Sequence, residues 1–233
     1  MTEPPQFDPS GLDRRRLDHH SLRRLIEERL RDSRPPIDSV DALPAGVTSA
    51  IAPELRSYFP AAPTASAVLV PIVDHPTGLT VLMTQRSSQL RTHAGEISFP
   101  GGRVEPVDRS PIDTALRETE EEIGLMREHV TFAGYLKPHL VLSGFWITPV
   151  VGFVQPGFAL KLDAREVENT FEVPLSHILD LANHRPRERI IGATSFHVYD
   201  IPFEQHNIWG VSAGILVDLY RLVTEAVAGT AQQ

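Results

Sequence analysis

The sequence concentrates carboxylates in one short run, Arg117-Glu118-Thr119-Glu120-Glu121-Glu122. In a helix, which turns by about 100° per residue, Glu118, Glu121 and Glu122 fall within an arc of roughly 100°. Like charges at these spacings repel by on the order of a few tenths of a kcal/mol per pair, so we expect a cation among them. Mg²⁺ usually combines one or two carboxylates with waters and substrate phosphates. The run therefore indicates a divalent-metal site suited to pyrophosphate chemistry.

The neighbouring residues predict the elements that position this run. Ser110 is a good N-cap, Pro111 a good first helical residue and Gly124 a good terminator, so a helix is predicted over about residues 111–124. Its inner face carries apolar or small residues at helical spacing, Ile112, Ala115, Leu116, Thr119 and Ile123. Upstream, Gly101-Gly102 lets the backbone approach a metal or phosphate, and the Gly101 carbonyl is a candidate metal ligand. A surface acidic helix after a glycine turn is the alternative interpretation.

Composition excludes several functional classes. The 233 residues carry a formal net charge of −8 and include no cysteine. Disulfides, thiolate metal sites and cysteine nucleophiles are therefore excluded. The negative charge argues against a nucleic-acid partner, and no apolar run is long enough for a membrane span. Residues 1–13 resemble no signal peptide, so a cytoplasmic location and a small-molecule partner are expected.

The order of predicted elements favours an α+β fold, with a mixed β-sheet between layers of helices. Strand-like runs cover residues 65–73, 79–86, 130–138, 144–154 and 194–203. Helical patterns cover residues 17–32, 48–57, 175–182 and 207–228, the first as a surface helix. These elements do not alternate regularly enough for a doubly wound parallel sheet. We expect an N-terminal extension over residues 1–60 and one domain over residues 61–230.

Two further expectations concern apolar residues. The amphipathic pattern at residues 207–228 predicts a helix that covers the sheet, with a dimer seam as the alternative, so the chain is expected to be a monomer or homodimer. Large aromatics are interpreted as core packing rather than ligand contacts: Phe145, Trp146, Phe203 and Trp209.

The segment from Gly102 to Leu125 resembles the Nudix box, G-x5-E-x7-R-E-U-x-E-E-x-G-U with U aliphatic. Glu118, Glu121, Glu122, Gly124 and Leu125 agree with that pattern. Asp108 takes the place of the first glutamate, one extra residue separates it from Arg117, and Thr119 stands where an aliphatic residue is usual. The resemblance implies a Nudix-like α/β/α sandwich and a Nudix hydrolase.

The upstream segment resembles the signature of the coenzyme A pyrophosphatase branch of this family. It reads Leu82-Met83-Thr84-x-Arg86-Ser87-x3-Arg91-x3-Gly95-x3-Phe99-Pro100-Gly101-Gly102. This resemblance implies hydrolysis of the diphosphate of coenzyme A or an acyl-coenzyme A, giving 3′,5′-ADP and (acyl-)4′-phosphopantetheine. The alternatives are a Nudix hydrolase of another diphosphate such as ADP-ribose or NADH, and a non-catalytic Nudix domain that senses a nucleotide.

The resemblance also implies residue roles. Glu118 and Glu122 would hold Mg²⁺ or Mn²⁺, while Glu121 would be either a ligand or the base that activates water. Glu166 is the alternative base, although an ordinary solvated glutamate is an almost equal interpretation. Arg117 would support the neighbouring carboxylates. Arg86 and Arg91 would bind substrate phosphate through their planar guanidinium groups, or else form salt bridges that support the loop.

Overall fold

The computed structural model describes residues 18–35, 58–59, 63–191 and 194–230, without the side chains of residues 191, 194, 196 and 226–230. One sequence expectation, the short helix over residues 48–57, lies outside these ranges. The expected boundary at residue 60 also falls there and stays a prediction.

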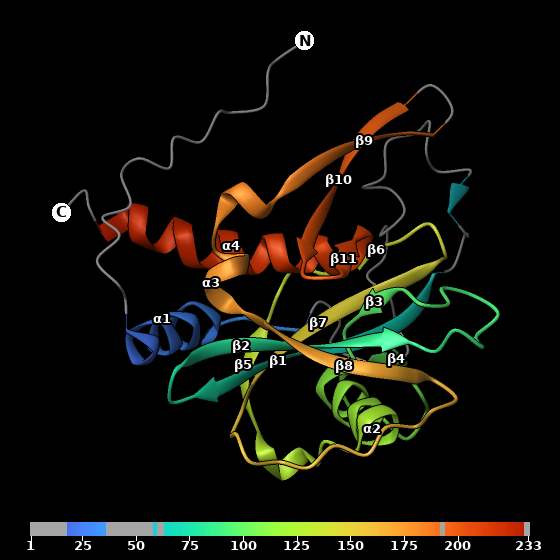
Figure 1. Cartoon of the computed structure of the whole chain (residues 1–233), viewed down its shortest axis with the longest axis horizontal. Helices are drawn as coiled ribbons and strands as arrows, with labels where there is room; N and C mark the ends of the chain where they lie inside the picture. The colour runs from blue at the N-terminus through green and yellow to red at the C-terminus, as the bar shows by residue number, and fades with distance from the viewer. Residues whose placement is uncertain (1–17, 36–57, 60–62, 192–193, 231–233) are drawn as a thin grey trace.

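The main sheet has eight strands and runs through the middle of the molecule (Figure 1). Its central order is β3-β2-β1-β7-β5; β4 pairs with β1, β6 with β7 and β8 with β2. β1 and β7 run parallel over ten residues, whereas the other pairings are antiparallel. The expected mixed sheet is thus confirmed. The strands are β1 (Thr64–His75), β2 (Gly78–Arg86), β3 (Ile97–Ser98), β4 (Gly101–Arg103), β5 (Val130–Tyr135), β6 (His139–Leu140), β7 (Phe145–Val154) and β8 (Val167–Pro174).

One edge of β1 changes partner part-way along its length. Residues 66–68 pair with β4, whereas residues 72–75 pair with β2. Between these two stretches the Leu69 amide donates to the Pro100 carbonyl at 2.9 Å. β2 and β4 therefore diverge, and the Pro100-Gly101 turn lies where they separate.

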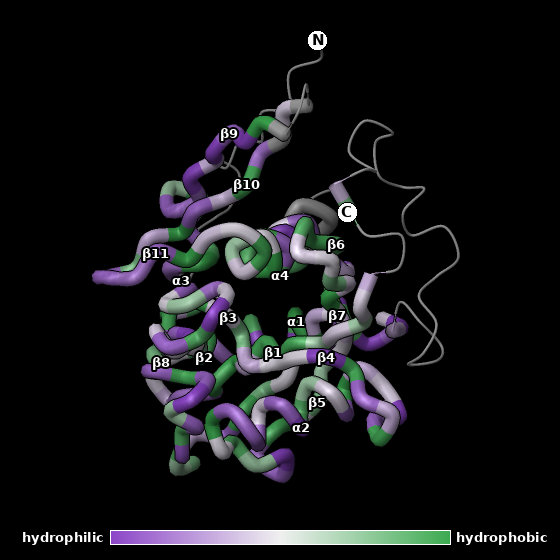
Figure 2. The backbone as a smooth tube through the Cα atoms, turned by 90° about the vertical axis from the view of Figure 1, so that its right-hand side faces the viewer, coloured by the Kyte–Doolittle hydropathy of each residue, from purple (hydrophilic) through white to green (hydrophobic). Residues whose placement is uncertain are grey.

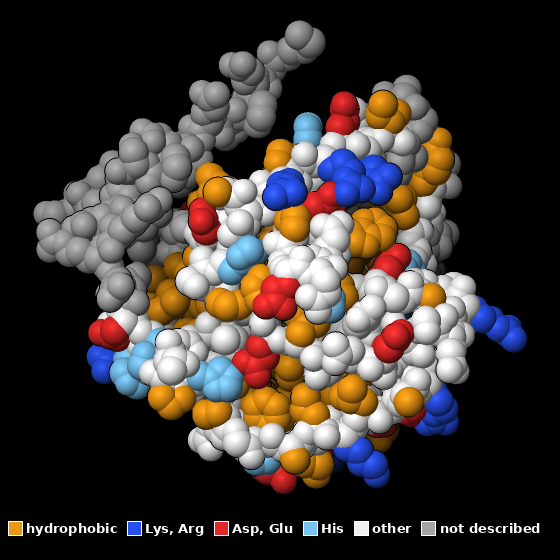
Figure 3. Space-filling view, viewed as in Figure 1, with side chains coloured by type: hydrophobic (Ala, Val, Ile, Leu, Met, Phe, Trp, Pro, Cys, Tyr) orange, Lys and Arg blue, Asp and Glu red, His pale blue; other side chains and the backbone are white. Residues whose placement is uncertain are grey.

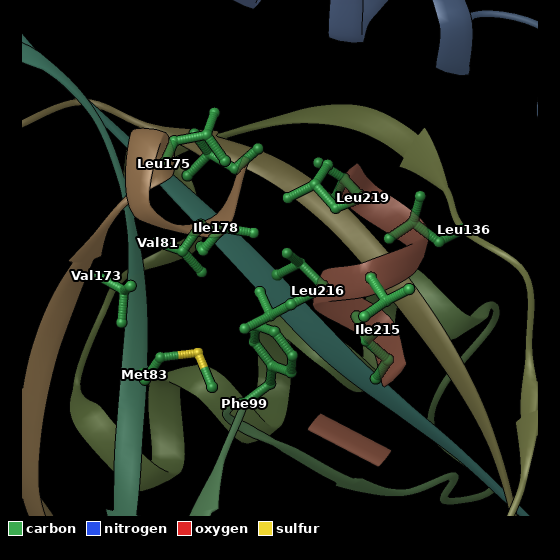
Figure 4. Packing of buried hydrophobic residues seen from close by; sticks show 14 of the residues in the cluster. Val81, Met83, Phe99, Leu136, Val173, Leu175, Ile178, Ile215, Leu216 and Leu219 are labelled. Carbon is green, nitrogen blue, oxygen red and sulfur yellow. The ribbon is translucent and has the colours of Figure 1, made fainter. Parts of the chain in front are cut away.

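Helices cover both faces of the sheet, as expected for an α/β/α sandwich. The helices are α1 (His19–Leu30), α2 (Pro111–Ile123), α3 (Leu175–Ile178) and α4 (Gly210–Thr230). Alternate residues of a strand point to opposite faces, so β2 places Leu82 in the core against α2 and Val81 and Met83 in the core against α4. Figure 4 shows this second core, in which Met83 and Phe99 lie near Leu216.

The helix predicted over residues 17–32 is present as α1, but it is more than a surface helix. Ile26 is fully buried and Leu30 is 2% exposed, and both belong to the core that includes α4. Asp18 caps the helix by accepting a hydrogen bond from the Ser21 amide at 2.8 Å. The periodicity was sufficient to find the helix, whereas its deep packing depends on a groove formed by distant elements.

A second sheet of three antiparallel strands stands beyond α4 (Figure 2). It contains β9 (Arg185–Ile191), β10 (Thr194–Phe203) and β11 (His206–Trp209). The helix expected from residue 207 was placed too early, because residues 206–209 pair with β10 and α4 begins at Gly210. The helix expected over residues 175–182 was also too long, since α3 ends at Ile178 and a 3-10 turn follows at Leu181–Asn183. β10 was predicted; β8 and β9 were not.

Candidate active site

The acidic helix is α2, and local signals fix both of its ends. The Ser110 hydroxyl accepts a hydrogen bond from the Asp113 amide at 3.3 Å, and Gly124 ends the helix in the left-handed conformation with φ 69°. Beyond the helix, the amides of Lys161 and Asp163 donate to the carbonyls of Ile123 and Glu122, each at 2.9 Å. The C-terminal end of α2 is thereby attached to the segment that leads to Glu166.

Glu122 is the most deeply buried carboxylate of the helix. Its side chain is 4% exposed, and one carboxylate oxygen accepts a hydrogen bond from the Gly101 amide at 3.1 Å. Burial raises the pKa of Glu122 to about 8; the Gly101 amide and Arg86 oppose the shift, and Glu118 and Glu166 add to it. A positive charge placed beside this buried carboxylate would therefore stabilise its ionised form.

Glu118 lies against the glycine pair. A Cβ atom at Gly102 would overlap the Glu118 carboxylate, so only glycine allows this close approach. Burial raises the pKa of Glu118, Arg117 opposes the shift, and the neighbouring Glu121 and Glu166 add to it. Glycine at position 102 and a carboxylate at position 118 thus form one packed unit.

Arg117 joins the helix to the preceding loop. It donates to both oxygens of Asp108 at 3.0 Å, to the Arg103 carbonyl at 3.0 Å, and to Glu118 at 3.0 Å. Asp108 is 7% exposed and also accepts hydrogen bonds from the Thr114 hydroxyl and the Glu105 amide. Burial alone would raise the pKa of Asp108, but hydrogen bonds led by that from Arg117 outweigh burial and lower it. These contacts make Arg117 a positioning residue.

Glu121 differs from the other two glutamates. Its side chain is 61% exposed, and one oxygen accepts a hydrogen bond from Arg117 at 3.2 Å. The expectation that three carboxylates converge is therefore too simple: within the described ranges, no three His, Asp or Glu side chains form a ready metal-binding cluster. Helical spacing predicts only the direction of each Cβ atom, whereas the position of the Glu121 carboxylate depends on its hydrogen bond from Arg117.

Arg86 and Glu166 meet across the β2–β8 pair. A bulge after Gln85 sets Arg86 opposite Val167, and the Ser87 amide donates to the Glu166 carbonyl at 2.8 Å. The Ser87 hydroxyl donates to the Ala164 carbonyl at 3.2 Å. Glu166 is exposed, yet its charge acts on both Glu118 and Glu122. The structure therefore brings Arg86 and Glu166 to the carboxylates of α2.

Two arginine environments differ sharply. The Arg86 Nε atom is buried without a hydrogen-bond partner, although its charge acts on Glu122. Arg91 is exposed on the loop after β2, and no partner for its guanidinium occurs in the described part of the chain. Arg86 is thus part of the site, whereas Arg91 lies on the loop beside it.

The residues present fit a divalent cation. Glu122 offers a buried carboxylate whose direct partner is a neutral amide, and Glu118 offers a second carboxylate against the same glycine turn. Both are oxygen donors of the kind that Mg²⁺ and Mn²⁺ prefer. Burial is the main cause of the raised pKa of each carboxylate, and a cation beside them would stabilise their ionised forms.

One aromatic residue was misjudged from the sequence. Trp209 is 37% exposed, so it is not the core residue that was expected. It ends β11 and borders a cavity beside β3. The polar residues His206 and Asn207 in the same strand were the sequence signal that Trp209 could be exposed, although aromatic residues in strands are more often buried.

A comparison with known protein families identifies the family of this chain. The family model described as the NUDIX domain matches residues 63–194, more than half of the chain. The chain belongs to the Nudix family. Nudix hydrolases act on nucleoside diphosphate derivatives and generally use divalent metal ions.

Curated relatives agree with this family assignment, and solved structures of similar fold were also found. The "Uncharacterized Nudix hydrolase NudL" of Photorhabdus laumondii is 41% identical over 158 residues, which are 68% of this chain and 84% of that protein. Its namesake in Escherichia coli K12 is 41% identical over 155 residues, 66% of this chain and 80% of the relative. An Ap4A hydrolase of C. elegans aligns with 72% of this chain and 99% of its own at 16% identity and TM-score 0.46. The NUDIX domain of Shewanella oneidensis NrtR, solved with ADP ribose, aligns with 59% of this chain and 87% of its own at 20% identity and TM-score 0.40.

The described part of this Nudix chain contains no helix long and apolar enough to cross a membrane.

Proposed function

We propose that this Nudix hydrolase cleaves the diphosphate of coenzyme A or an acyl-coenzyme A, giving 3′,5′-ADP and (acyl-)4′-phosphopantetheine. The observation that carries the proposal is the place of residues 82–102, the segment that resembles the coenzyme A branch. That segment supplies Arg86, whose charge acts on Glu122, and the Gly101 amide, which donates to Glu122. The segment that resembles the coenzyme A branch thus lies beside the carboxylates that we propose as metal ligands.

Glu118 and Glu122 are the proposed ligands of Mg²⁺ or Mn²⁺, with the Gly101 carbonyl as a further donor. The metal would supply charge neutralisation of the diphosphate and acidify or orient a bound water. Arg117 keeps Glu118 in place through its bonds to Asp108 and the Arg103 carbonyl. The Gly101 amide orients the Glu122 carboxylate.

Arg86 and Arg91 are the proposed contacts for substrate phosphate. The Arg86 Nε donor is buried and unpaired, and a phosphate oxygen would give that donor a charged acceptor. Arg91 is exposed on the adjoining loop, where its guanidinium is accessible to the same ligand.

The proposed base that takes a proton from the attacking water is Glu166. Its exposed carboxylate acts electrostatically on both Glu118 and Glu122, and its backbone is held by Ser87. Glu121 is the second candidate, but Arg117 already donates to its carboxylate. Comparing Glu166→Gln with Glu121→Gln over a range of pH separates them, because loss of the base removes the acidic limb of the activity profile.

The experiment that tests the proposed function is a substrate comparison. Purified protein is incubated with coenzyme A, an acyl-coenzyme A, ADP-ribose and NADH, with and without Mg²⁺ or Mn²⁺, and products are separated by chromatography. We expect 3′,5′-ADP and phosphopantetheine in the presence of metal. Intact coenzyme A beside hydrolysed ADP-ribose or NADH would overturn the substrate assignment, and binding without hydrolysis of any of them would indicate a nucleotide sensor.

A further inference from the structure

The three-stranded sheet carries a row of arginines on one face. Alternate residues of a strand share a face, so Arg185, Arg187 and Arg189 lie together on β9. Register places Arg185 opposite Asp200 and Asp200 opposite Trp209, so this face continues onto β10 and β11. We call this surface the arginine face.

The opposite face of the same sheet packs into the core. Ile201 of β10 and Ile208 of β11 are fully buried and belong to the cluster that contains Leu216 of α4. The arginine face is therefore turned away from α4. Figure 2 shows β9 as largely hydrophilic, and Figure 3 shows basic side chains gathered over this part of the molecule.

Most of the charge on the arginine face is available to a ligand. Arg187 forms an ion pair with Asp200. Arg185 and Arg189 are exposed, and neither has a carboxylate partner within the described ranges. The Arg189 guanidinium lies 5.9 Å from the centre of the Trp209 ring. A cation beside an exposed aromatic ring is suited to a ligand that has both a planar base and a phosphate.

A cavity of about 270 Å³ adjoins Trp209. The residues that line it include Trp209 and the polar residues Gln85, Glu96, Gln205 and Asn207. Amides and a carboxylate offer both donors and acceptors, which is the kind of lining that can read the edge of a nucleobase.

The cavity and the carboxylates of α2 are close along the chain. Gln85 lines the cavity and directly precedes Arg86, whose charge acts on Glu122. Ile97 also lines the cavity and precedes Gly101 by four residues, so their Cα atoms are at most about 15 Å apart. The segment of residues 85–101 therefore joins the cavity to the carboxylates of α2.

We propose that this cavity binds the nucleoside end of the substrate, with the base against Trp209, and that Arg189 pairs with a phosphate attached to the ribose. This inference rests on the proposed function, because coenzyme A carries such a phosphate outside its diphosphate. Arg189 is then a specificity residue that distinguishes coenzyme A from dephospho-coenzyme A, which lacks that single group.

The kinetic test compares these two substrates in wild-type protein, in Arg189→Gln and in Arg24→Gln. Arg24 is an exposed arginine of α1, so its substitution controls for the change in net charge. We expect Arg189→Gln to raise KM for coenzyme A about tenfold, with kcat retained and dephospho-coenzyme A changed less than about twofold. Arg24→Gln should change neither substrate. Equal effects on both substrates, or none on either, would overturn the assignment of Arg189.

A binding measurement gives a readout independent of turnover. Calorimetric titration with 3′,5′-ADP and with 5′-AMP should show tighter binding of 3′,5′-ADP by wild-type protein and equal binding by Arg189→Gln. A selective loss in Arg91→Gln instead would place the phosphate on the loop after β2 and contradict the proposal.

The two proposals fail in different ways. If wild-type protein cleaves NADH and NADPH but leaves coenzyme A intact, the proposed substrate is wrong, and NADPH against NADH becomes the matched pair for Arg189. Unchanged discrimination of that pair in Arg189→Gln would then overturn the ribose-phosphate site as well. Cleavage of none of these compounds would overturn both.

Discussion

At the scale of single residues, α2 uses its carboxylates in distinct ways. Glu122 is buried against an amide, Glu118 fills the space that Gly102 leaves open, and Glu121 is exposed and held by Arg117. Asp108 accepts hydrogen bonds from the Nε and Nη2 atoms of Arg117 and keeps that side chain beside Glu118. Carboxylates of similar chemistry therefore have different roles because their partners differ.

Glu122→Gln should abolish catalysis while leaving the fold intact. The substitution keeps the size of the side chain but removes the charge that the metal requires, so turnover should fall by about three orders of magnitude. Glu120→Gln on the same helix is the control, because Glu120 bonds to Arg127 away from the site. Turnover is measured together with circular dichroism. Near-wild-type turnover of Glu122→Gln would refute the ligand assignment.

Asp108→Asn should destabilise the protein in a pH-dependent way. Loss of the partly buried ion pair should cost about 2–3 kcal/mol near neutral pH. The folded-state pKa of Asp108 is lowered, so its contribution is present above the unfolded value and is lost as the pH falls through the folded value. The difference from wild type, measured by urea unfolding, should therefore shrink below about pH 4. A pH-independent difference would contradict this reading, and Asp32→Asn on an exposed turn is the control.

At the scale of elements, the site depends on two short segments that hold α2 from opposite sides. The glycine pair that begins β4 contacts Glu118 and Glu122. The segment from Lys161 to Glu166 donates hydrogen bonds to the end of α2 and accepts one from the Ser87 amide. The helix is thus fixed at its carboxylate face and at its C-terminus. The glycine pair contributes little apolar surface, so its effect should appear in activity more than in stability, whereas Leu162 of the second segment packs against the core.

Gly102→Ala tests the first of these segments. Gly102 has no positive φ, so alanine fits the backbone, but its Cβ would displace the Glu118 carboxylate. We expect turnover to fall at least about tenfold and the apparent metal affinity to weaken, with unfolding free energy changed by less than about 1 kcal/mol. Gly214→Ala, within α4, controls for the added methyl group. Unimpaired metal activation of Gly102→Ala would show that Glu118 is not a ligand.

At the scale of the whole molecule, the N-terminal helix and the C-terminal helix share one core. Ile26 and Leu30 of α1 pack in the same cluster as Leu216 and Leu219 of α4. The expected boundary at residue 60 stays a prediction, and α1 packs on the core of the domain that follows it.

Ile26→Ala measures how far α1 supports the domain. Removing this fully buried side chain should cost about 3 kcal/mol of unfolding free energy. Glu28→Ala, at an exposed position of the same helix, should change stability by less than about 0.5 kcal/mol. Chemical denaturation with a single cooperative transition is expected for both. A separate early transition that alone shifts in Ile26→Ala would show that α1 is an independent extension.

Local patterns were enough to predict much of this molecule. The caps at Ser110 and Gly124 predicted the ends of α2 closely, and runs of apolar and β-branched residues predicted β1 and β2, because these signals act between near neighbours. The patterns failed for β9, because its arginines and proline are typical of a loop and its strand conformation depends on pairing with β10. Local patterns also did not predict the burial of Glu122 or the contact between Ser87 and Glu166, since both depend on residues brought together by the sheet.

The parallel pairing of β1 with β7 has a consequence for the order of events during synthesis. The Ser66 hydroxyl donates to the Trp146 carbonyl, and these residues are 80 positions apart. Long-range parallel pairing forms slowly because a large loop must close, at a cost in chain entropy, before the stabilising contacts can form. α2 and its glycine turn emerge from the ribosome before β7, so Glu118 and Glu122, the proposed metal ligands, are present on a nascent chain whose central sheet is still incomplete. High metal affinity should therefore be gained in the last kinetic phase of folding.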